Sequence, residues 1–331
     1  MKKNILYFSI LSIISFFLLT TLYLNNTYSE FDSTNVRNNI YVLSSDTLGG
    51  RLAGSTENLV AAEIIKNRFI DYGLKTLNGD GNYTQDFNTI CPVTTNTSPY
   101  LKIEYNGDTE EELQYGVDFK EDMINFKNNT FSFSKSDKIN SYLSYLDITC
   151  DDGTFLLYVP KDNNFSFRSS FFSDFAKDAV IMVSQNAFDK ITSSLNEGKQ
   201  ISIHVPFEEE EKTISNVIGV IKGSNSSLSP FIITAHYDHL GKDGLGTSYS
   251  GALDNASGTS FILELSRSLS TYGKPERDII FVALNAEEFG LLGSKAFAEE
   301  NLFNIQDSKV INFDMIGSAD YPISLMQGSK F

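Results

Sequence analysis

Cysteine and basic residues are scarce in this sequence of 331 residues. Its two cysteines, Cys91 and Cys150, are too few for a disulfide framework, and neither has a histidine or a second cysteine at metal-binding spacing. We interpret them as structural thiols or as one disulfide. Lys and Arg number 26 against 42 Asp and Glu, a net charge of −16. Because nucleic-acid binders need clustered Lys and Arg, this balance argues against nucleic acid as a partner.

The N-terminus carries a long apolar run, residues 5–24, which is preceded by Lys2 and Lys3. A charged start and an apolar stretch are typical of an export signal, and about 20 apolar residues can span a bilayer. No A-x-A cleavage site and no lipid-attachment cysteine lies near the end of the run. We predict that residues 1–29 are a signal peptide or a membrane anchor, with that choice left open. The rest of the chain is then extracytoplasmic, either secreted or tethered.

Two segments of different character follow. Residues 30–88 are predicted to be the N-terminal part of the main domain and contain an amphipathic helix with Ala62, Ile65 and Phe69 on one face. Residues 89–212 are rich in Asn, Ser, Phe and Asp with short β-like pieces, which predicts an inserted, smaller β-rich domain. The core of this domain is predicted to include five phenylalanines: Phe165, Phe167, Phe171, Phe172 and Phe175.

The C-terminal part, residues 213–331, follows an acidic run at 208–211 that we interpret as a solvated linker. Its predicted strands are 217–221, 231–235, 279–284 and 310–313, and its predicted helices are 254–269 and 291–301. The unbroken apolar run 279–284 is expected in a central strand that is covered on both faces. The alternation predicts an α/β fold, a three-layer sandwich in which helices flank a mixed, mostly parallel central sheet.

Histidine and acidic residues directly follow three of these strands. They are His236 and Asp238, Glu287 and Glu288, and Asp314, and Asp254 stands before a predicted helix. Because open α/β sheets bind ligands at the carboxyl ends of their strands, these side chains can converge on one site. One histidine with several carboxylates suits a divalent cation, zinc above all. Carboxylates gathered in one pocket repel each other unless a cation neutralises them, so the pattern predicts a metal site.

Spacing assigns further roles. His236 and Asp238 are two residues apart and project the same way on an extended backbone, so Asp238 can accept a hydrogen bond from the imidazole and orient it. Glu287 and Glu288 are adjacent and cannot point the same way. One can therefore bind the metal while the other acts on the attacking water as a general base.

Taken one at a time, these residues have ordinary structural interpretations. Asp254 alone suits the N-cap of a helix, and a Glu287–Glu288 pair alone suits solvated charge at a helix start. Their joint position at strand ends favours the functional interpretation. We interpret Arg51 and Asp243, which lie outside this pattern, as structural.

Four segments in order carry a resemblance to a known family. They read TAHYDHLG at 234–241, GALDNASG at 251–258, NAEEFGLLGS at 285–294 and NFDMIG at 312–317. They resemble the signatures of metallopeptidase family twenty-eight, the co-catalytic di-zinc aminopeptidases. The run GGRLAGS at 49–55 resembles the opening of members that carry a protease-associated insert. The resemblance covers residues 34–88 and 213–331 and is loose between them.

The resemblance implies a role for each matching residue. His236 and Asp314 would bind one zinc, Asp254 would bridge two zinc ions, Glu288 would bind the second, and Glu287 would be the general base. It also implies a cis peptide bond between Asp254 and Asn255. Two zinc ions about 3.5–4 Å apart would polarise the scissile carbonyl and activate water.

This sequence departs from the family in one respect, because members supply a further histidine downstream to the second zinc. The histidines here are His204, His236 and His239. We interpret His204 as a surface or core residue of the insert, and His239 as part of the motif's loop. The second zinc would then have two protein ligands, where catalytic sites usually keep three. We therefore expect the catalytic domain to be truncated. A fragment or an interrupted reading frame is the favoured explanation over a natural short form, and full activity of this chain is doubtful.

The main functional prediction is a zinc aminopeptidase that releases N-terminal residues from peptides or proteins. Two alternatives stay open. One is a relative with carboxypeptidase, dipeptidase or glutaminyl cyclase activity. The other is a catalytically impaired binding protein or remnant, tethered through residues 5–24.

Overall fold

The computed structural model describes residues 29–124, 128–166, 176–300, 307–320, 322–324 and 326. The predicted export or anchor run at 5–24 lies outside the described residues, as do Phe167, Phe171, Phe172 and Phe175 of the predicted aromatic core. Within the described part, no helix combines the length and hydropathy needed to cross a bilayer.

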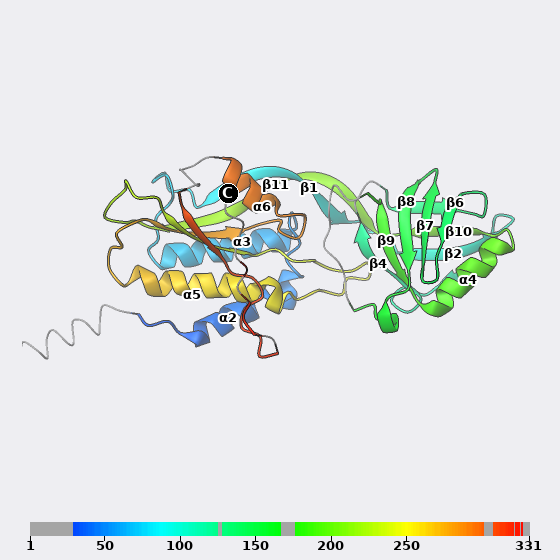
Figure 1. The fold of residues 1–331 in the computed structure, drawn as a ribbon, viewed down its shortest axis with the longest axis horizontal. Helices are drawn as coiled ribbons and strands as arrows, with labels where there is room; N and C mark the ends of the chain where they lie inside the picture. Colours follow the sequence, from blue (N-terminus) through cyan, green and yellow to red (C-terminus); the bar gives the residue numbers. More distant parts are fainter. Residues whose placement is uncertain are drawn as a thin grey trace, which may run out of the picture.

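A five-stranded mixed sheet forms the centre of the first lobe (Figure 1). Its order is β1 (Thr84–Thr94), β11 (Phe207–Ile221), β13 (Ile279–Leu284), β12 (Phe231–His236) and β14 (Lys309–Asn312). The pairs β13–β12 and β12–β14 are parallel, whereas β1–β11 and β11–β13 are antiparallel. The predicted α/β class with a mixed sheet is confirmed, but two of the four strand pairs are antiparallel, so the sheet is not mostly parallel.

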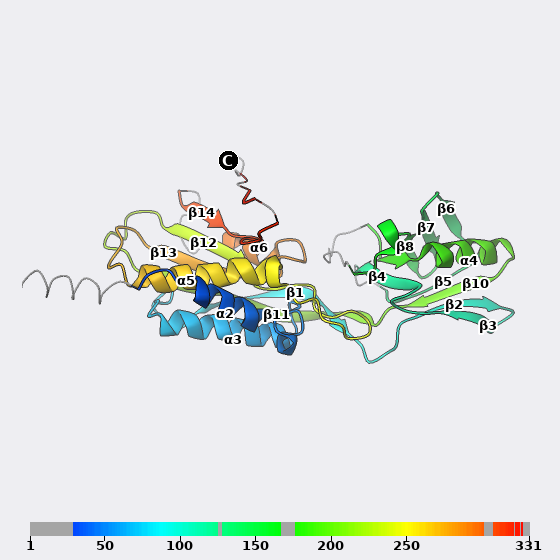
Figure 2. The ribbon, with the colours of Figure 1, turned by 90° about the horizontal axis from the view of Figure 1, so that it is seen from below.

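Helices cover both faces of this sheet. The helices α2 (Ser33–Leu43), α3 (Thr56–Asp71) and α5 (Gly258–Ser270) lie on one face, and α6 (Leu292–Glu299) lies on the other (Figure 2). Successive residues of β13 point to opposite faces: buried Phe281 packs with Phe69 of α3, and buried Val282 packs with Phe297 of α6. Both faces of β13 are therefore apolar, which explains its unbroken apolar run and confirms the three layers.

Local sequence signals set the bounds of α3. Ser55 is the N-cap, and its side chain accepts a hydrogen bond from the backbone N–H of Asn58 at 3.1 Å. Gly73 follows the end of the helix with φ of 75°, a left-handed conformation that favours glycine. The predicted face of Ala62, Ile65 and Phe69 is buried. These features place α3 against β11 and leave its other side in solvent.

The remaining strands form a second lobe between β1 and β11 in the chain (Figure 1). One sheet orders β3 (Asp108–Leu113), β2 (Tyr100–Tyr105), β10 (Gln200–His204) and β5 (Thr130–Phe133). The other orders β4 (Phe119–Ile124), β9 (Ala179–Val183), β8 (Gly153–Tyr158), β7 (Tyr145–Cys150) and β6 (Lys138–Ser141), and α4 (Gln185–Asn196) packs on β10. The domain boundaries at residues 89 and 212 stay predictions.

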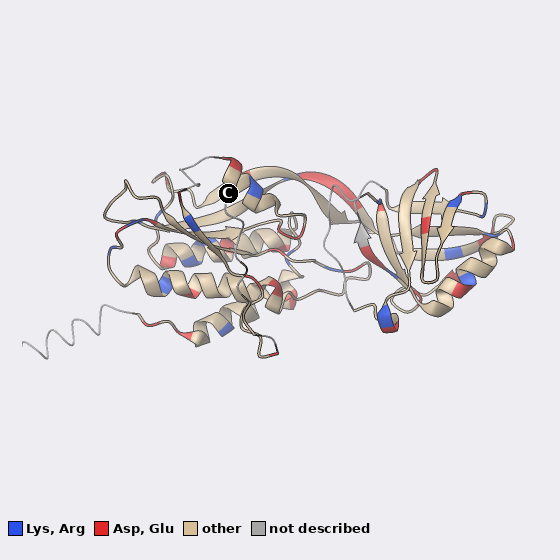
Figure 3. Cartoon of the chain, viewed as in Figure 1, with Lys and Arg blue, Asp and Glu red and all other residues tan. Residues whose placement is uncertain are grey.

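The long pair of β1 and β11 joins the two lobes (Figure 3). The acidic run 208–211, interpreted from the sequence as a linker, is exposed but lies within β11 and pairs with residues 90–93 of β1. Cys91 of β1 is buried and Cys150 of β7 is partly buried, and both are free thiols.

Candidate metal centre

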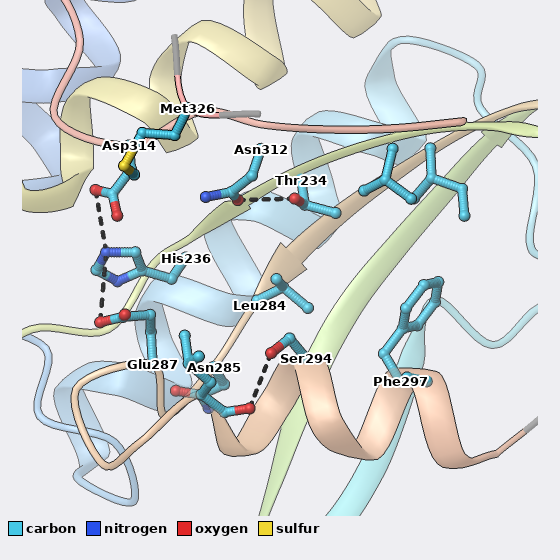
Figure 4. Close-up of a pocket in the computed structure, with 14 residues that line it drawn as sticks. Thr234, His236, Leu284, Asn285, Glu287, Ser294, Phe297, Asn312, Asp314 and Met326 are labelled. Atoms are coloured by element: carbon cyan, nitrogen blue, oxygen red, sulfur yellow. Dashed lines mark hydrogen bonds and ion pairs between the residues drawn. The ribbon is translucent and has the colours of Figure 1, made fainter. Parts of the chain in front are cut away.

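His236 ends β12, and carboxylates surround its imidazole. Its Nε2 atom lies 3.2 Å from Oδ1 of Asp254, 3.5 Å from Oδ1 of Asp314 and 3.9 Å from Oε2 of Glu287. Glu287 and Asp314 approach the ring from opposite sides (Figure 4). The imidazole is 2% exposed. The structure therefore brings together residues that the sequence places at the ends of three strands and in the turn before α5.

Asp238 connects the ends of β12 and β13. Its side chain is fully buried, and Oδ1 lies 3.5 Å from Nδ1 of His236. The same carboxylate accepts backbone hydrogen bonds from Glu287 at 3.1 Å and from Glu288 at 3.2 Å. Asp238 thus fixes the loop after β13 relative to the imidazole at the end of β12.

The adjacent glutamates diverge, as the sequence requires. Glu288 is 5% exposed in its side chain, and its Oε1 lies 2.9 Å from Nδ1 of His239. Glu287 is 31% exposed and lines a cavity of about 550 Å³. The apolar wall of this cavity includes Ile232 of β12 and Val310 of β14. Leu284 of β13, Phe297 of α6 and Met326 after β14 complete it (Figure 4).

Asp254 lies in the turn Ala252–Ser257, directly before α5. Its peptide bond to Asn255 is cis. Two groups of potential ligand atoms share this residue, and within each group the atoms lie within 4.8 Å of one another. One group is His236, Asp254 and Asp314, and the other is His239, Asp254 and Glu288.

The electrostatics of the site reflect its crowded negative charge. Burial raises the pKa of Glu287 to about 7, and the nearby carboxylates Glu288, Asp238 and Asp314 add to the rise against the opposing charge of His236. Burial by itself lowers the pKa of His236, but the negative carboxylates around it, Asp238 foremost, outweigh burial and raise that pKa well above its ordinary value. A cation at this position would relieve the repulsion among the carboxylates.

Arg51 supplies a buried positive charge behind the site. Its guanidinium donates hydrogen bonds to the carbonyls of Tyr237 at 2.9 Å, Ser250 at 2.8 Å and Gly251 at 3.0 Å, and also to the carbonyl of Leu43. Burial lowers the pKa of Arg51 to about 10, although the nearby site carboxylates oppose this. Its structural role agrees with the sequence interpretation, but its position behind the metal-site loop was not visible from the sequence.

The residues present fit a zinc ion. Both ring nitrogens of His236 are buried, and neither has a hydrogen-bond partner of normal geometry among the residues that the structure describes. A buried imidazole without such a partner is costly unless another group takes up its lone pair. Imidazole nitrogen with carboxylate oxygens is a donor set that zinc accepts.

His239 lies in the loop of its motif, as predicted from the sequence. The sequence analysis did not place its side chain beside Glu288, where it is 10% exposed. The available signal was chemical: it is one of three histidines in the chain and stands three residues after His236. The remaining histidine, His204, lies in the second lobe, hydrogen bonded to Thr97 and Thr130.

Residues 216–330 match the model of peptidase family M28. The chain is 35% identical over 138 residues to the glutamate carboxypeptidase 2 homolog of Caenorhabditis elegans, and 38% identical over 125 residues to aminopeptidase NAALADL1 of Mus musculus. These matches cover 40% and 36% of this chain, and 17% and 16% of the two relatives. The zinc aminopeptidase BSAP from Bacillus subtilis has a similar fold, with a TM-score of 0.52 at 18% identity over 87% of this chain and 70% of that one.

The family match spans β12, β13 and β14 and therefore every residue of the two ligand groups. The matched range contains the four segments that carry the resemblance, which meet at the carboxyl ends of these strands and in the turn before α5. Through residues 216–330, the chain is similar to peptidase family M28.

Proposed function

We propose that this chain carries the catalytic centre of a zinc-dependent exopeptidase, an aminopeptidase that acts outside the cytoplasm. One observation carries the proposal: two groups of ligand atoms share Asp254, while Glu287 faces His236 from outside both groups. A carboxylate shared by two cations, with a separate carboxylate beside them, is an arrangement suited to metal-assisted hydrolysis. We propose two zinc ions, one in each group.

Zinc bound there would polarise the peptide carbonyl and lower the pKa of water. Glu287 would take a proton from the attacking water and return it to the leaving amine nitrogen. Its partial exposure gives it access to a substrate, whereas Glu288 is enclosed and suited to hold a ligand in place. Asp238 would hold both glutamates in a fixed position relative to His236 through the two backbone hydrogen bonds that it accepts.

The relatives that are named aminopeptidases support substrates with a free N-terminus. We therefore propose peptides or proteins with free N-termini as substrates, although one relative is named an aminopeptidase and another a carboxypeptidase homologue. We also propose that residues 5–24 direct export and either are removed or tether the protein to the membrane.

The test compares the full chain with Glu287→Gln, using peptides with free and acetylated N-termini. We expect bound zinc, loss of activity with a chelator, and no cleavage of acetylated peptides. Glu287→Gln should keep its zinc and lose about 10²–10⁴-fold in turnover, the usual contribution of a general base. Glu63→Gln, an exposed change on α3, is the matched control and should retain activity.

Each part of the proposal can fail separately. A chain that binds no zinc would contradict the metal centre itself. Turnover retained in zinc-loaded Glu287→Gln would remove Glu287 as the base. Cleavage that depends on a free C-terminus and ignores N-terminal acetylation would replace the aminopeptidase with a carboxypeptidase.

A further inference from the structure

The loop after β13, residues 285–293, carries both Glu287 and Glu288, and we name it the glutamate loop. Its backbone is unusual, because Ala286 has φ of 53° and Leu291 has φ of 64°, both in the left-handed region. Residues other than glycine rarely adopt this conformation, and it persists where the surrounding structure holds it. The shape of the loop therefore depends on groups outside the loop.

One buried amide from β11 closes the base of the glutamate loop. Oδ1 of Asn216 accepts a hydrogen bond from the backbone N–H of Asn285 at 2.9 Å, and Nδ2 donates to the carbonyl of Gly293 at 2.8 Å. The same nitrogen donates to Oε1 of Gln85, on β1, at 2.8 Å. Asn216 is fully buried. Its side chain thus joins the first and last residues of the loop.

The backbone approaches Gly293 too closely for any side chain at that position. A Cβ atom at this glycine would lie 2.1 Å from the carbonyl oxygen of Asn285 and 2.5 Å from Oδ1 of Asn216. The same proximity lets the backbone N–H of Gly293 donate to that carbonyl at 2.9 Å. A primary amide offers an acceptor oxygen and a donor nitrogen, so asparagine can bond to both ends of the loop at once. A hydrophobic side chain of similar size cannot.

A pair of buried amides fixes the start of the loop to α3. Nδ2 of Asn285 donates to Oδ1 of Asn58 at 3.0 Å, and Nδ2 of Asn58 donates back to Oδ1 of Asn285 at 3.1 Å. That Asn285 oxygen also accepts the backbone N–H of Ala286, one of the two left-handed residues, at 2.9 Å. Asn58 is fully buried and donates to the carbonyl of Arg51 at 3.1 Å. These amides lie outside the two ligand groups, so they support the loop without taking part in either group.

We propose that Asn216 is a positioning residue, which closes the base of the glutamate loop and thereby directs Glu287 toward His236. Asp238 holds the backbone N–H groups of both glutamates, whereas Asn216 holds the two ends of the loop. The chemical consequence rests on the proposed function, in which Glu287 is the base. The closure of the loop itself requires no metal.

Loss of this amide would leave the N–H of Asn285 and the carbonyl of Gly293 without their side-chain partner. Unpaired buried groups favour conformations in which they reach water, so the loop should open about 10–100-fold more often. The alternative is that Asn216 only stabilises the fold as a whole. Its loss would then speed hydrogen exchange of the core through global unfolding, with no excess in the glutamate loop.

The experiment measures hydrogen exchange of the full chain in zinc-containing buffer, with Asn216→Leu as the main variant. The probes are the backbone N–H groups of Glu287 and Glu288, and those of β13 serve as the reference. We expect the probes to exchange about 10–100-fold faster in Asn216→Leu, in excess of any change in β13. Asn216→Thr suits a strand but is too short to bond to both ends of the loop, so it should give the same result where the leucine variant does not fold.

Leu74→Ala is the matched control for a general loss of stability. Leu74 is buried and lies against Gly219, three residues after Asn216 on β11. Its truncation should speed exchange in β13 with no excess in the probes. In zinc-loaded chain that cleaves peptide, Asn216→Leu should lower kcat about 10–100-fold with KM nearly unchanged, because it misplaces the base and leaves the cavity in place.

The outcomes separate this inference from the proposed function. If the probes show no excess over β13 in Asn216→Leu or Asn216→Thr, Asn216 only stabilises the fold and the inference is wrong. If the loop opens while kcat stays unchanged, the loop is closed by Asn216 but the positioning role is overturned. If the unchanged chain binds no zinc and cleaves no peptide, the proposed function fails, and the exchange rates alone decide whether Asn216 holds Glu287 in place.

Discussion

A buried ion pair connects the second lobe to the loop that leads into the metal centre. Nζ of Lys120, in β4, lies 3.0 Å from Oδ2 of Asp243, and the two side chains are 9% and 6% exposed. The other oxygen of Asp243 accepts backbone hydrogen bonds from Leu245 at 3.0 Å and Thr247 at 2.9 Å. The same loop continues to Gly251 and Asp254, so this pair fixes one end of the segment that carries Asp254, a proposed metal ligand.

We predict that Asp243→Asn strongly destabilises the protein. The amide keeps an acceptor for the two backbone N–H groups but turns donors toward Lys120, which is left buried without its counter-charge. Breaking a buried pair from one side costs about 3–5 kcal/mol. We expect the lower end, about 3 kcal/mol, because the Lys120 ammonium also lies 5.1 Å from the ring centroid of Tyr249. The measurement is the free energy of unfolding by urea.

The double variant Lys120→Met/Asp243→Asn removes both charges and should recover most of that loss, since replacing a whole buried pair is often nearly neutral. Glu112→Gln, which breaks the exposed Lys102–Glu112 pair, is the control and should change stability by less than about 1 kcal/mol. The reasoning is refuted if Asp243→Asn lowers the free energy of unfolding no more than this control and the double-mutant cycle shows no interaction energy between Lys120 and Asp243. Water would then screen the pair.

The pair also predicts a dependence on pH. Burial raises the pKa of Asp243, but hydrogen bonds from Lys120 and the loop outweigh burial and lower it. A carboxylate with a lowered folded-state pKa stabilises the protein above its unfolded value of about 3.9, and this contribution is lost as pH falls through the folded-state pKa. Stability below about pH 4 should therefore fall more steeply in the unchanged protein than in Asp243→Asn.

Two further substitutions test the support of the metal centre. Arg51→Lys keeps the charge but cannot reproduce the guanidinium's hydrogen bonds to several carbonyls, so unfolding should become easier by about 1–3 kcal/mol for each carbonyl left unpaired. The exposed Arg37→Lys should leave the free energy of unfolding unchanged in the same urea titration. If the two variants lower that free energy equally, the hydrogen bonds of Arg51 have no special role in stability. Asp238→Asn should weaken zinc binding about 10–100-fold in competition with a chelator, because one of its two backbone N–H bonds is lost. An affinity equal to that of Asp71→Asn, an exposed change at the end of α3, would contradict this.

The strands of the first lobe were predictable where apolar runs have clear ends. The predicted strands 231–235 and 279–284 correspond to Phe231–His236 and Ile279–Leu284. β11 was predicted only at 217–221, although it extends over Phe207–Ile221. Its first half is a run of exposed glutamates with no alternation of apolar residues, so the strand depends on pairing with β1 and has no local signal.

The convergence of the candidate metal residues was more predictable than the fold around them. The topology of an α/β sheet brings the carboxyl ends of its strands together, and ligands bind at those ends. The convergence of His236, Glu287 and Asp314 could therefore be predicted from their positions after strands. The direction of His239 could not be predicted because it depends on a loop packed against Gly251. The contacts of Arg51 could not be predicted either, since its hydrogen-bond partners include carbonyls that are 186 to 200 residues away along the sequence.

The different roles proposed for Glu287 and Glu288 follow from the backbone conformation more than from their side chains. Asp238 accepts the N–H groups of both Glu287 and Glu288 with its two carboxylate oxygens, which fixes the direction in which each Cα–Cβ bond leaves the loop. Glu288 then points into the enclosed group with His239, and Glu287 points toward Nε2 of the buried His236 from the side of the cavity. Chemically identical side chains thus acquire different environments: enclosure makes Glu288 suited to be a ligand, and access to solvent beside the imidazole makes Glu287 suited to move a proton. Exchanging their roles would require a different backbone conformation after β13, since no change of rotamer alone reverses which side of the loop each residue occupies.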